Sequence, residues 1–392
     1  MKSNKRIASI DIFRALTMFL MIFVNDLWTL DNIPAWLGHA AAREDRLGLA
    51  DVVFPAFLFI VGLSIPFAIT NRREKGATDL STFFHIIQRS FALIVMGIFM
   101  VNFENINREL LPINKYYWEI LMALAIFFIW TNYQTKKVLN TIPVWLMEVF
   151  GIVILIILAS IYQGGSVASP AWMKTHWWGI LGLIGWAYLL NAIIYLLLGQ
   201  RIVIIGILVI LFHTLNVQEY LELGNFSGIK IIINASNYAL VISGVFASVL
   251  YITLRDRNKQ HLFLMILMIL AIIFILYAFA IRPYWGISKI GGTPSWTAIC
   301  AGISYGFYGL LYLISDIYKK TKWANIFGPA GRSTLTCYLV PYYYYPIMAL
   351  IGIRLPMYLR EGYIGITKSL LFALLIIMIT GVLERFKIKL KI

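Results

Sequence analysis

Residues 49–70 have the sequence LADVVFPAFLFIVGLSIPFAIT, and this stretch decides the class of fold. It contains twenty-two residues, of which Asp51 is the only charged one. A helix needs about 20 predominantly apolar residues to cross the hydrocarbon core of a bilayer. We therefore predict a membrane-spanning helix with one carboxylate near its first residue.

Composition places the whole chain in the same class. Of its 392 residues, 60% are hydrophobic and 13% are charged, whereas soluble domains carry about a quarter charged residues. No polar stretch is long enough to fold separately, so we predict one all-α integral membrane domain over residues 1–392. Cys300 and Cys337 both lie in apolar segments, so no disulfide framework is implied.

Apolar runs recur from end to end and predict a polytopic bundle of 11–12 transmembrane helices. The seventh run is short and the eleventh begins with polar residues, so a bundle of eleven helices and one of twelve both stay open. The predicted spans are 8–30, 49–70, 82–101, 116–132, 140–162, 176–196, 200–216, 229–254, 261–281, 295–316, 324–350 and 365–384.

The net charge of +15 comes mainly from short connectors between these runs. If the N-terminus is cytoplasmic, inner connectors hold nineteen Lys and Arg residues and outer connectors hold nine. Such a bias follows the positive-inside rule. It predicts that both termini are cytoplasmic, that the loop around His39 is extracytoplasmic, and that the positive charge does not serve nucleic-acid binding.

The first predicted helix carries a polar stripe. Asp11 and Arg14 are three residues apart and so share one face. Asn25 follows Arg14 by eleven residues, about three turns, and falls on the same face. A structural ion pair and a packing asparagine explain this stripe as well as a functional site does.

Other predicted spans also contain polar residues, and a charge at bilayer depth usually faces the protein interior. Each one alone is explained by a hydrogen bond between helices. Together they predict a polar cavity through the bundle, which suits an enzyme or a transporter equally. The residues are Asp51, Arg89, Glu119, Asn191, Asn234 and Asn237.

His39 precedes the second span, with Glu44, Asp45 and Asp51 close behind it. These carboxylates are placed to orient an imidazole, which can then act as a general base or carry an acyl group. A lone loop histidine without a catalytic role is the alternative. We predict no metal site, because no second histidine lies at ligand spacing.

The eleventh predicted span opens with FGPAGRSTLTCYL, residues 327–339. A glycine-rich turn at a helix start offers backbone N–H groups to phosphate, and Gly331, Arg332 and Ser333 form the predicted site. Lys319 lies just upstream on the same predicted side. The alternative is that Gly and Pro only begin the helix.

Four segments resemble the heparan-α-glucosaminide N-acetyltransferase family and its bacterial relatives. The resemblance is best over residues 7–102 and looser over 288–350. The four segments are IASIDIFRALTMFLMIFVN (7–25), HAAAREDRLGLADVVFPAFLFIVGLSI (39–65), QRSFALIVMGIFMVN (88–102) and SKIGGTPSWT (288–297).

The resemblance implies a transmembrane acetyltransferase that moves an acetyl group from cytoplasmic acetyl-CoA to a glucosamine amine across the membrane. It places the family's catalytic histidine on His39. We predict that His39 acts as general base or acetyl carrier, that Asp51 or Glu44 orients the ring, and that Asn25 helps to stabilise the oxyanion. The resemblance also matches Asp11, Arg14, Arg89 and Trp296 to family positions. We further predict that Glu44, Asp45 and Trp296 contact the acceptor, and that Asp11, Arg14, Arg89 and Asn237 lie in the cavity.

The chain departs from the family pattern after His39, where AREDR replaces the usual residues, and near VPYYYYP. The acceptor is therefore an amino sugar or another glycan, and N- and O-acetylation of a surface polysaccharide both stay open. We expect a multi-pass protein of the inner (cytoplasmic) membrane in contact with membrane lipid, with acetyl-CoA as co-substrate and a homodimer as a candidate assembly. The rival interpretations are a noncatalytic relative and a secondary transporter or flippase, although the inverted repeats typical of transporters are absent from the sequence.

Overall fold

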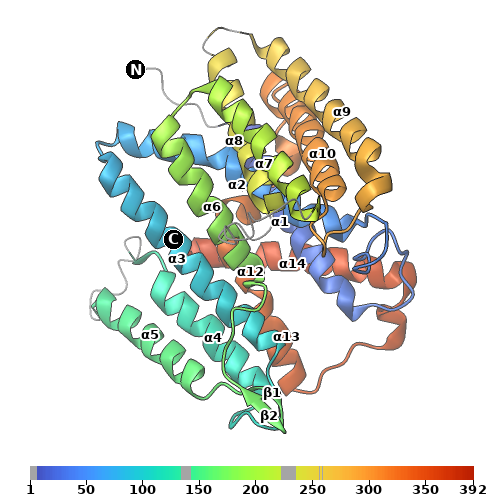
Figure 1. Ribbon diagram of the computed structural model, residues 1–392. Helices are drawn as coiled ribbons and strands as arrows, with labels where there is room; N and C mark the ends of the chain where they lie inside the picture. The colour runs from blue at the N-terminus through green and yellow to red at the C-terminus, as the bar shows by residue number, and fades with distance from the viewer. Residues whose placement is uncertain (1–6, 134–142, 222–234, 256, 258) are drawn as a thin grey trace.

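The structure, a computed structural model, describes residues 7–133, 143–221, 235–255, 257 and 259–392. The starts of the predicted spans 140–162 and 229–254, with Asn234, lie outside these residues. The described part is a helical bundle with one small antiparallel hairpin, formed by β1 (Gly164–Ser166) and β2 (Ser169–Ala171) (Figure 1). The helices are α1 (Ala8–Asp26), α2 (Leu49–Glu74), α3 (Asp79–Glu104), α4 (Lys115–Trp130), α5 (Val144–Ser160), α6 (Gly179–Leu198), α7 (Ile202–Leu221), α8 (Ala235–Arg255), α9 (Gln260–Trp285), α10 (Pro294–Tyr312), α11 (Gly328–Arg332), α12 (Thr334–Leu339), α13 (Pro341–Leu350) and α14 (Gly362–Arg385).

Eight helices within the described residues are long and apolar enough to cross a membrane: α1, α2, α3, α6, α8, α9, α10 with its continuation to Ile317, and α14. Two shorter apolar helices, α5 and α7, supplement them. The predicted all-α polytopic membrane fold is therefore confirmed.

The predicted span 324–350 is not one helix. A 3₁₀ turn over Lys322–Phe327 leads into α11, and Ser333 leaves the helical conformation between α11 and α12. Pro341 then begins α13, because proline has no N–H for a bond to the preceding turn. The chain thus crosses this region in short pieces, which bring α11 against the start of α1.

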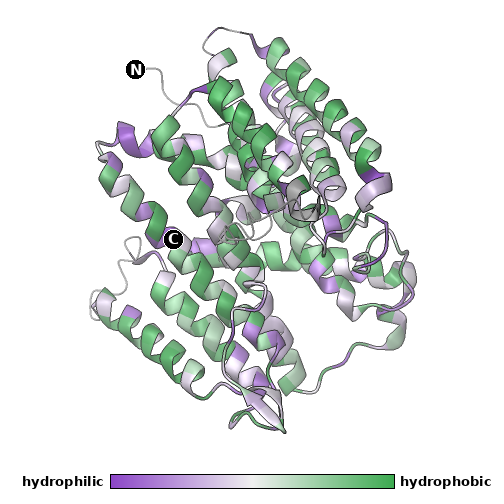
Figure 2. Ribbon diagram, viewed as in Figure 1, coloured by the Kyte–Doolittle hydropathy of each residue, from purple (hydrophilic) through white to green (hydrophobic). Residues whose placement is uncertain are grey.

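Burial separates a central pair of helices from a peripheral set. Nearly every residue of α8 is buried, and α8 packs along α2 in the middle of the bundle. By contrast, α5 and α9 bury few residues. Both are mostly hydrophobic in Figure 2 and lie at the edge of the bundle, as expected for helices that face lipid.

Two glycines allow α2 and α8 to approach closely. A Cβ atom at Gly62 would overlap the carbonyl oxygen of Val241, and one at Gly244 would overlap the carbonyl oxygen of Phe59. Small residues at helix contacts are the usual basis of close packing in membranes. This contact fixes the axis of α2, whose first turn carries Asp51.

The first helix is held at both ends by carboxylates that sequence reasoning did not single out. At its start, the Asp316 carboxylate accepts the N–H groups of Ala8 and Ser9 at 3.1 and 2.9 Å. At its end, buried Asp26 forms a 2.6 Å ion pair with Lys368 of α14 and accepts the Ser369 hydroxyl at 2.6 Å. The register of α1 is therefore fixed relative to α10 and α14.

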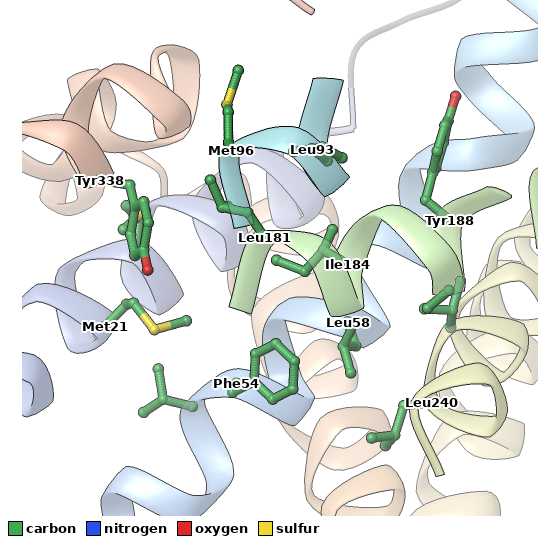
Figure 3. Close-up of a cluster of buried hydrophobic side chains, with 14 of the residues drawn as sticks. Met21, Phe54, Leu58, Leu93, Met96, Leu181, Ile184, Tyr188, Leu240 and Tyr338 are labelled. Carbon is green, nitrogen blue, oxygen red and sulfur yellow. The ribbon is translucent and has the colours of Figure 1, made fainter. Parts of the chain in front are cut away.

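An apolar cluster fills the middle of the bundle (Figure 3). Met21 of α1, Phe54 and Leu58 of α2 and Leu181 and Ile184 of α6 are all buried there. The layer they form contains no charged side chain among the residues that Figure 3 labels. It lies between the two polar ends of α1 and α2.

Replacing Gly62 by alanine tests the close contact between α2 and α8. We expect Gly62→Ala to destabilise the protein by about 1–3 kcal/mol, because the added methyl group must displace backbone. The thermal unfolding midpoint in detergent should fall by several degrees. Gly306→Ala is the matched control, since a Cβ there meets Ala271 at an ordinary 3.4 Å; equal midpoints for the two variants would contradict the proposed packing.

Candidate active site

The loop between α1 and α2 brings His39 onto Asp51. Asp51 is the third residue of α2, and its side chain is 1% exposed. One carboxylate oxygen accepts the N–H groups of Ala40 and Gly48 at 3.0 and 3.1 Å, while the other lies 2.7 Å from His39 Nδ1. The backbone donors and the helix N-terminus both favour the ionised carboxylate.

This arrangement selects one tautomer of His39. An ionised carboxylate can only accept hydrogen bonds, so Nδ1 carries the proton and donates it to Asp51. The lone pair is then on Nε2. Because the His39 side chain is 50% exposed, the group can take a proton or attack a carbonyl carbon. Asp51 stabilises the imidazolium that proton transfer would create.

The charged residues after His39 brace the loop. Glu44 pairs with Arg46 at 2.8 Å, and this hydrogen bond, together with one from the Ala41 N–H, lowers the pKa of the Glu44 carboxyl. Arg46 also donates to the His39 carbonyl oxygen at 3.3 Å. Asp45 pairs with Arg282 at the end of α9 at 3.0 Å. The structure therefore gives Glu44 and Asp45 partners within the protein, and Asp51 rather than Glu44 orients the imidazole.

Trp296 supports Asp51 from behind. Its indole is buried in α10, and its N–H donates to the Asp51 backbone carbonyl at 3.1 Å. The thiol of Cys300 lies 3.9 Å from the same oxygen. Trp296 was predicted to contact the acceptor, but its single side-chain N–H donor is bonded to α2. Asn25 is exposed at the end of α1, and no hydrogen bond in the described part of the chain joins it to His39.

Lys289 is a residue at this site that sequence reasoning counted only as a connector charge. Its Nζ lies 3.3 Å from His39 Nδ1, although 250 positions separate the two residues in sequence. The available signal was its place in SKIGGTPSWT, one of the family-like segments. Hydropathy and spacing could not show that the loop before α10 folds against the loop before α2.

A second polar region surrounds a cavity of about 350 Å³ near the start of α1. Four cationic side chains line it: Arg14, Arg89, Arg332 and Lys391. The rest of the lining includes apolar residues such as Met21, Phe57 and Leu181, and Figure 3 shows Met21 and Leu181 in the apolar cluster. The cavity therefore joins a positively charged end to an apolar interior.

The cations of the cavity differ in their partners. Arg14 donates to Ser64 at 2.7 Å and lies 3.4 Å from Asp11. The Arg89 guanidinium lies 4.9 Å from the ring centroid of Tyr188, and Arg332 pairs with Glu384 at 2.9 Å. Lys391 is brought to the cavity because the terminal segment pairs with the end of α4, where the Lys391 N–H donates to the Trp130 carbonyl at 2.8 Å.

The predicted phosphate turn is only partly placed at this cavity. Gly331 and Arg332 line it, and a Cβ at Gly331 would lie 3.0 Å from the Asp11 carbonyl oxygen. Ser333 is buried, and its hydroxyl donates to Glu384 at 2.6 Å. Lys319 is exposed and does not line the cavity.

This cavity does not reach the predicted catalytic residues. Neither His39 nor Asp51 lines the cavity, and Asn237 is buried in α8 away from its lining. On α2 the lining begins at Phe57, six residues or about 9 Å from Asp51. The apolar layer that includes Met21 and Phe54 lies between the cavity and Asp51. A core packed in this way leaves no room for water. No three His, Cys, Asp or Glu side chains gather as a metal site in the ranges that the structure describes.

The part of the chain that contains the dyad is similar to known proteins. Residues 6–172 match the family described as heparan-alpha-glucosaminide N-acetyltransferase, catalytic. The heparan-alpha-glucosaminide N-acetyltransferase of Mus musculus is 36% identical over 104 residues, and that of Homo sapiens is 37% identical over 101 residues. These matches cover 26% and 25% of the chain and 14% of each relative.

The chain therefore aligns with about one seventh of the length of the curated relatives it matches. The region that matches the family includes both His39 and Asp51. The resemblance predicted from the sequence is confirmed: residues 6–172 are similar to the catalytic region of the heparan-α-glucosaminide N-acetyltransferase family.

Proposed function

We propose that this protein is a transmembrane acetyltransferase that uses acetyl-CoA and acetylates an amino sugar or another glycan. The observation that carries the proposal is the His39–Asp51 pair, which lies inside the family match and in which the His39 side chain is half exposed. The curated relatives are N-acetyltransferases by name, which supports a transferase. The proposal includes acetyl-CoA as the acetyl donor, an extracytoplasmic position for His39, and a role of His39 in the transfer.

The chemistry assigned to His39 is proton transfer coupled to acyl transfer. The acceptor nitrogen attacks the thioester carbonyl, the new N–C bond forms, and Nε2 takes the nitrogen's proton. The C–S bond then breaks, and the thiolate leaves and collects a proton. In a two-step variant, Nε2 itself attacks the thioester and carries the acetyl group to the acceptor. Asp51 acts in the same way in both routes.

The cationic cavity is the proposed donor site. Coenzyme A combines several phosphate charges with a long, mostly neutral pantetheine arm. Arginine forms strong charge-assisted bonds to phosphate, and Arg14, Arg89, Arg332 and Lys391 supply four positive groups. The apolar part of the cavity, which follows α1 as far as Met21, suits the arm. Ser333 and Lys319 lie apart from the cavity and are weaker candidates.

The arm must pass the apolar layer to reach His39. Met21 and Phe54 are the side chains at this level of α1 and α2. We propose that they turn aside when acetyl-CoA binds, which would open the remaining distance of about 9 Å along α2. The reacting thioester would then lie in a site closed to water on the donor side.

The acceptor is proposed to enter from the side of His39. The excess of Lys and Arg in alternate connectors supports an extracytoplasmic position for this loop, and with it a location in the cytoplasmic membrane. Asn25, exposed at the end of α1, is the proposed oxyanion donor. Glu44, Asp45 and Trp296 are proposed to shape the acceptor site through the loop and helix that they hold.

Removing the imidazole tests the reaction. We expect His39→Ala to lower acetyl transfer by about 10²–10⁴-fold, because the general base is lost. The assay uses the purified protein in liposomes, labelled acetyl-CoA, and a panel of glucosamine-ended and hydroxyl-only glycans. His261→Ala is the control, since His261 is exposed at the start of α9.

Equal transfer by wild type and His39→Ala would refute the role of His39. Label found only on hydroxyl-only glycans would assign an O-acetyltransferase instead. Uptake of a solute without any acetyl transfer would favour the transporter interpretation and reject the proposed function.

Removing one cavity cation tests the donor site. We expect Lys391→Met to raise the KM for acetyl-CoA about tenfold with kcat nearly unchanged, because one charge-assisted phosphate bond is lost. Lys75→Met is the control, since Lys75 is an exposed lysine at the end of α2 outside the cavity. The same KM for acetyl-CoA in both variants would exclude the cationic end of the cavity as the phosphate site.

A further inference from the structure

The loop between α9 and α10 places an ammonium group beside the dyad. Lys289 Nζ lies 3.3 Å from His39 Nδ1, and the side chain is half-buried. Since Nδ1 already donates to Asp51 at 2.7 Å, it cannot accept a hydrogen bond from Lys289. The ammonium therefore acts on the ring through its charge.

Lys289 is held in this position by its neighbours. The Ser288 hydroxyl donates to the Ala42 carbonyl at 3.0 Å, which ties the two loops together. The Ser288 N–H donates to Thr293 at 3.1 Å, and Asn216 of α7 donates to the Gly292 carbonyl at 2.9 Å. A lysine on a braced loop differs from a freely moving surface lysine, because less side-chain entropy opposes its contact.

Asp51 and Lys289 both contact the His39 ring, at 2.7 and 3.3 Å from Nδ1. Glu44 is neutralised by Arg46, and Asp45 by Arg282. The charged groups on the loop of His39, the start of α2, the end of α9 and the loop before α10 are Arg43, Glu44, Asp45, Arg46, Asp51, Arg282 and Lys289, of which Arg43 is exposed.

The charges of Asp51 and Lys289 oppose each other. A buried carboxylate next to imidazole favours the protonated ring, and a ring that is already protonated cannot accept the proton of an incoming amine. A nearby ammonium disfavours the protonated ring. A cation beside the ring therefore opposes the effect of Asp51 on its protonation.

We propose that Lys289 is a positioning residue that offsets the charge of Asp51 and keeps His39 in its proton-accepting form before the acceptor arrives. The catalytic role of Lys289 rests on the proposed function, whereas the effect of its charge on the His39 ring does not depend on that function. Burial lowers the pKa of Lys289, and the Asp51 carboxylate acts against this shift. The carboxylate thus supports the ionised form of the ammonium.

The test measures the protonation of His39 without using acetyl transfer. Diethylpyrocarbonate acylates the unprotonated imidazole, and mass spectrometry of the His39 peptide gives the extent of reaction at each pH. We expect Lys289→Met to move the pH of half-maximal modification upward by about one unit, because one positive charge near the ring is lost. Lys289→Arg should restore the wild-type value, and the acid limb of the pH–rate profile should shift in parallel.

Lys174→Met, at an exposed lysine before α6, is the control and should leave the curve unchanged. Thermal unfolding in detergent checks that each variant is folded. An unchanged modification curve in folded Lys289→Met would overturn the proposal. If the curve shifts but wild type transfers no acetyl group at any pH, the effect of Lys289 stands and the proposed function fails.

Discussion

The carboxylate of Asp51 is the group on which the candidate site depends. It accepts the N–H groups of Ala40 and Gly48, holds His39 Nδ1, and presents its backbone carbonyl to Trp296. One residue thereby joins the first turn of α2, the loop before it and α10. A buried charge is tolerated only when such partners satisfy it, so the fold around α2 and the tautomer of His39 have a common cause.

The rest of the molecule keeps two polar regions apart. The close packing of Gly62 against α8 fixes α2, and Asp316 and Asp26 fix the two ends of α1. Cations gather at one end of these helices and the dyad at the other, with an apolar layer between them. This separation suits an enzyme whose donor and acceptor approach from opposite sides, because only the flexible arm of the donor has to cross.

The sequence predicted the class of fold, because length and hydropathy are local properties. It left Asp51 and Glu44 as alternative partners of His39, and in the structure Asp51 is the carboxylate at hydrogen-bond distance from the ring. It did not predict the break of the span 324–350, where Ser333 leaves the helical conformation and Pro341 restarts a helix. It also missed Lys289, Lys391 and Asp26, whose contacts join residues far apart in the chain. Glu44 and Asp45 were expected to face the acceptor, but their nearest opposite charges lie within the protein. Periodicity cannot show which loops meet.

The most direct measurement of the central claim is the rate of acetyl transfer by Asp51→Asn. An asparagine of the same size can still accept the backbone N–H groups, but it can no longer hold the His39 tautomer by charge. We predict a fall in kcat of about 10³–10⁴-fold, with the KM for acetyl-CoA and the unfolding midpoint close to wild type. Transfer at the wild-type rate by this variant would contradict the account of Asp51 and His39 as a catalytic pair.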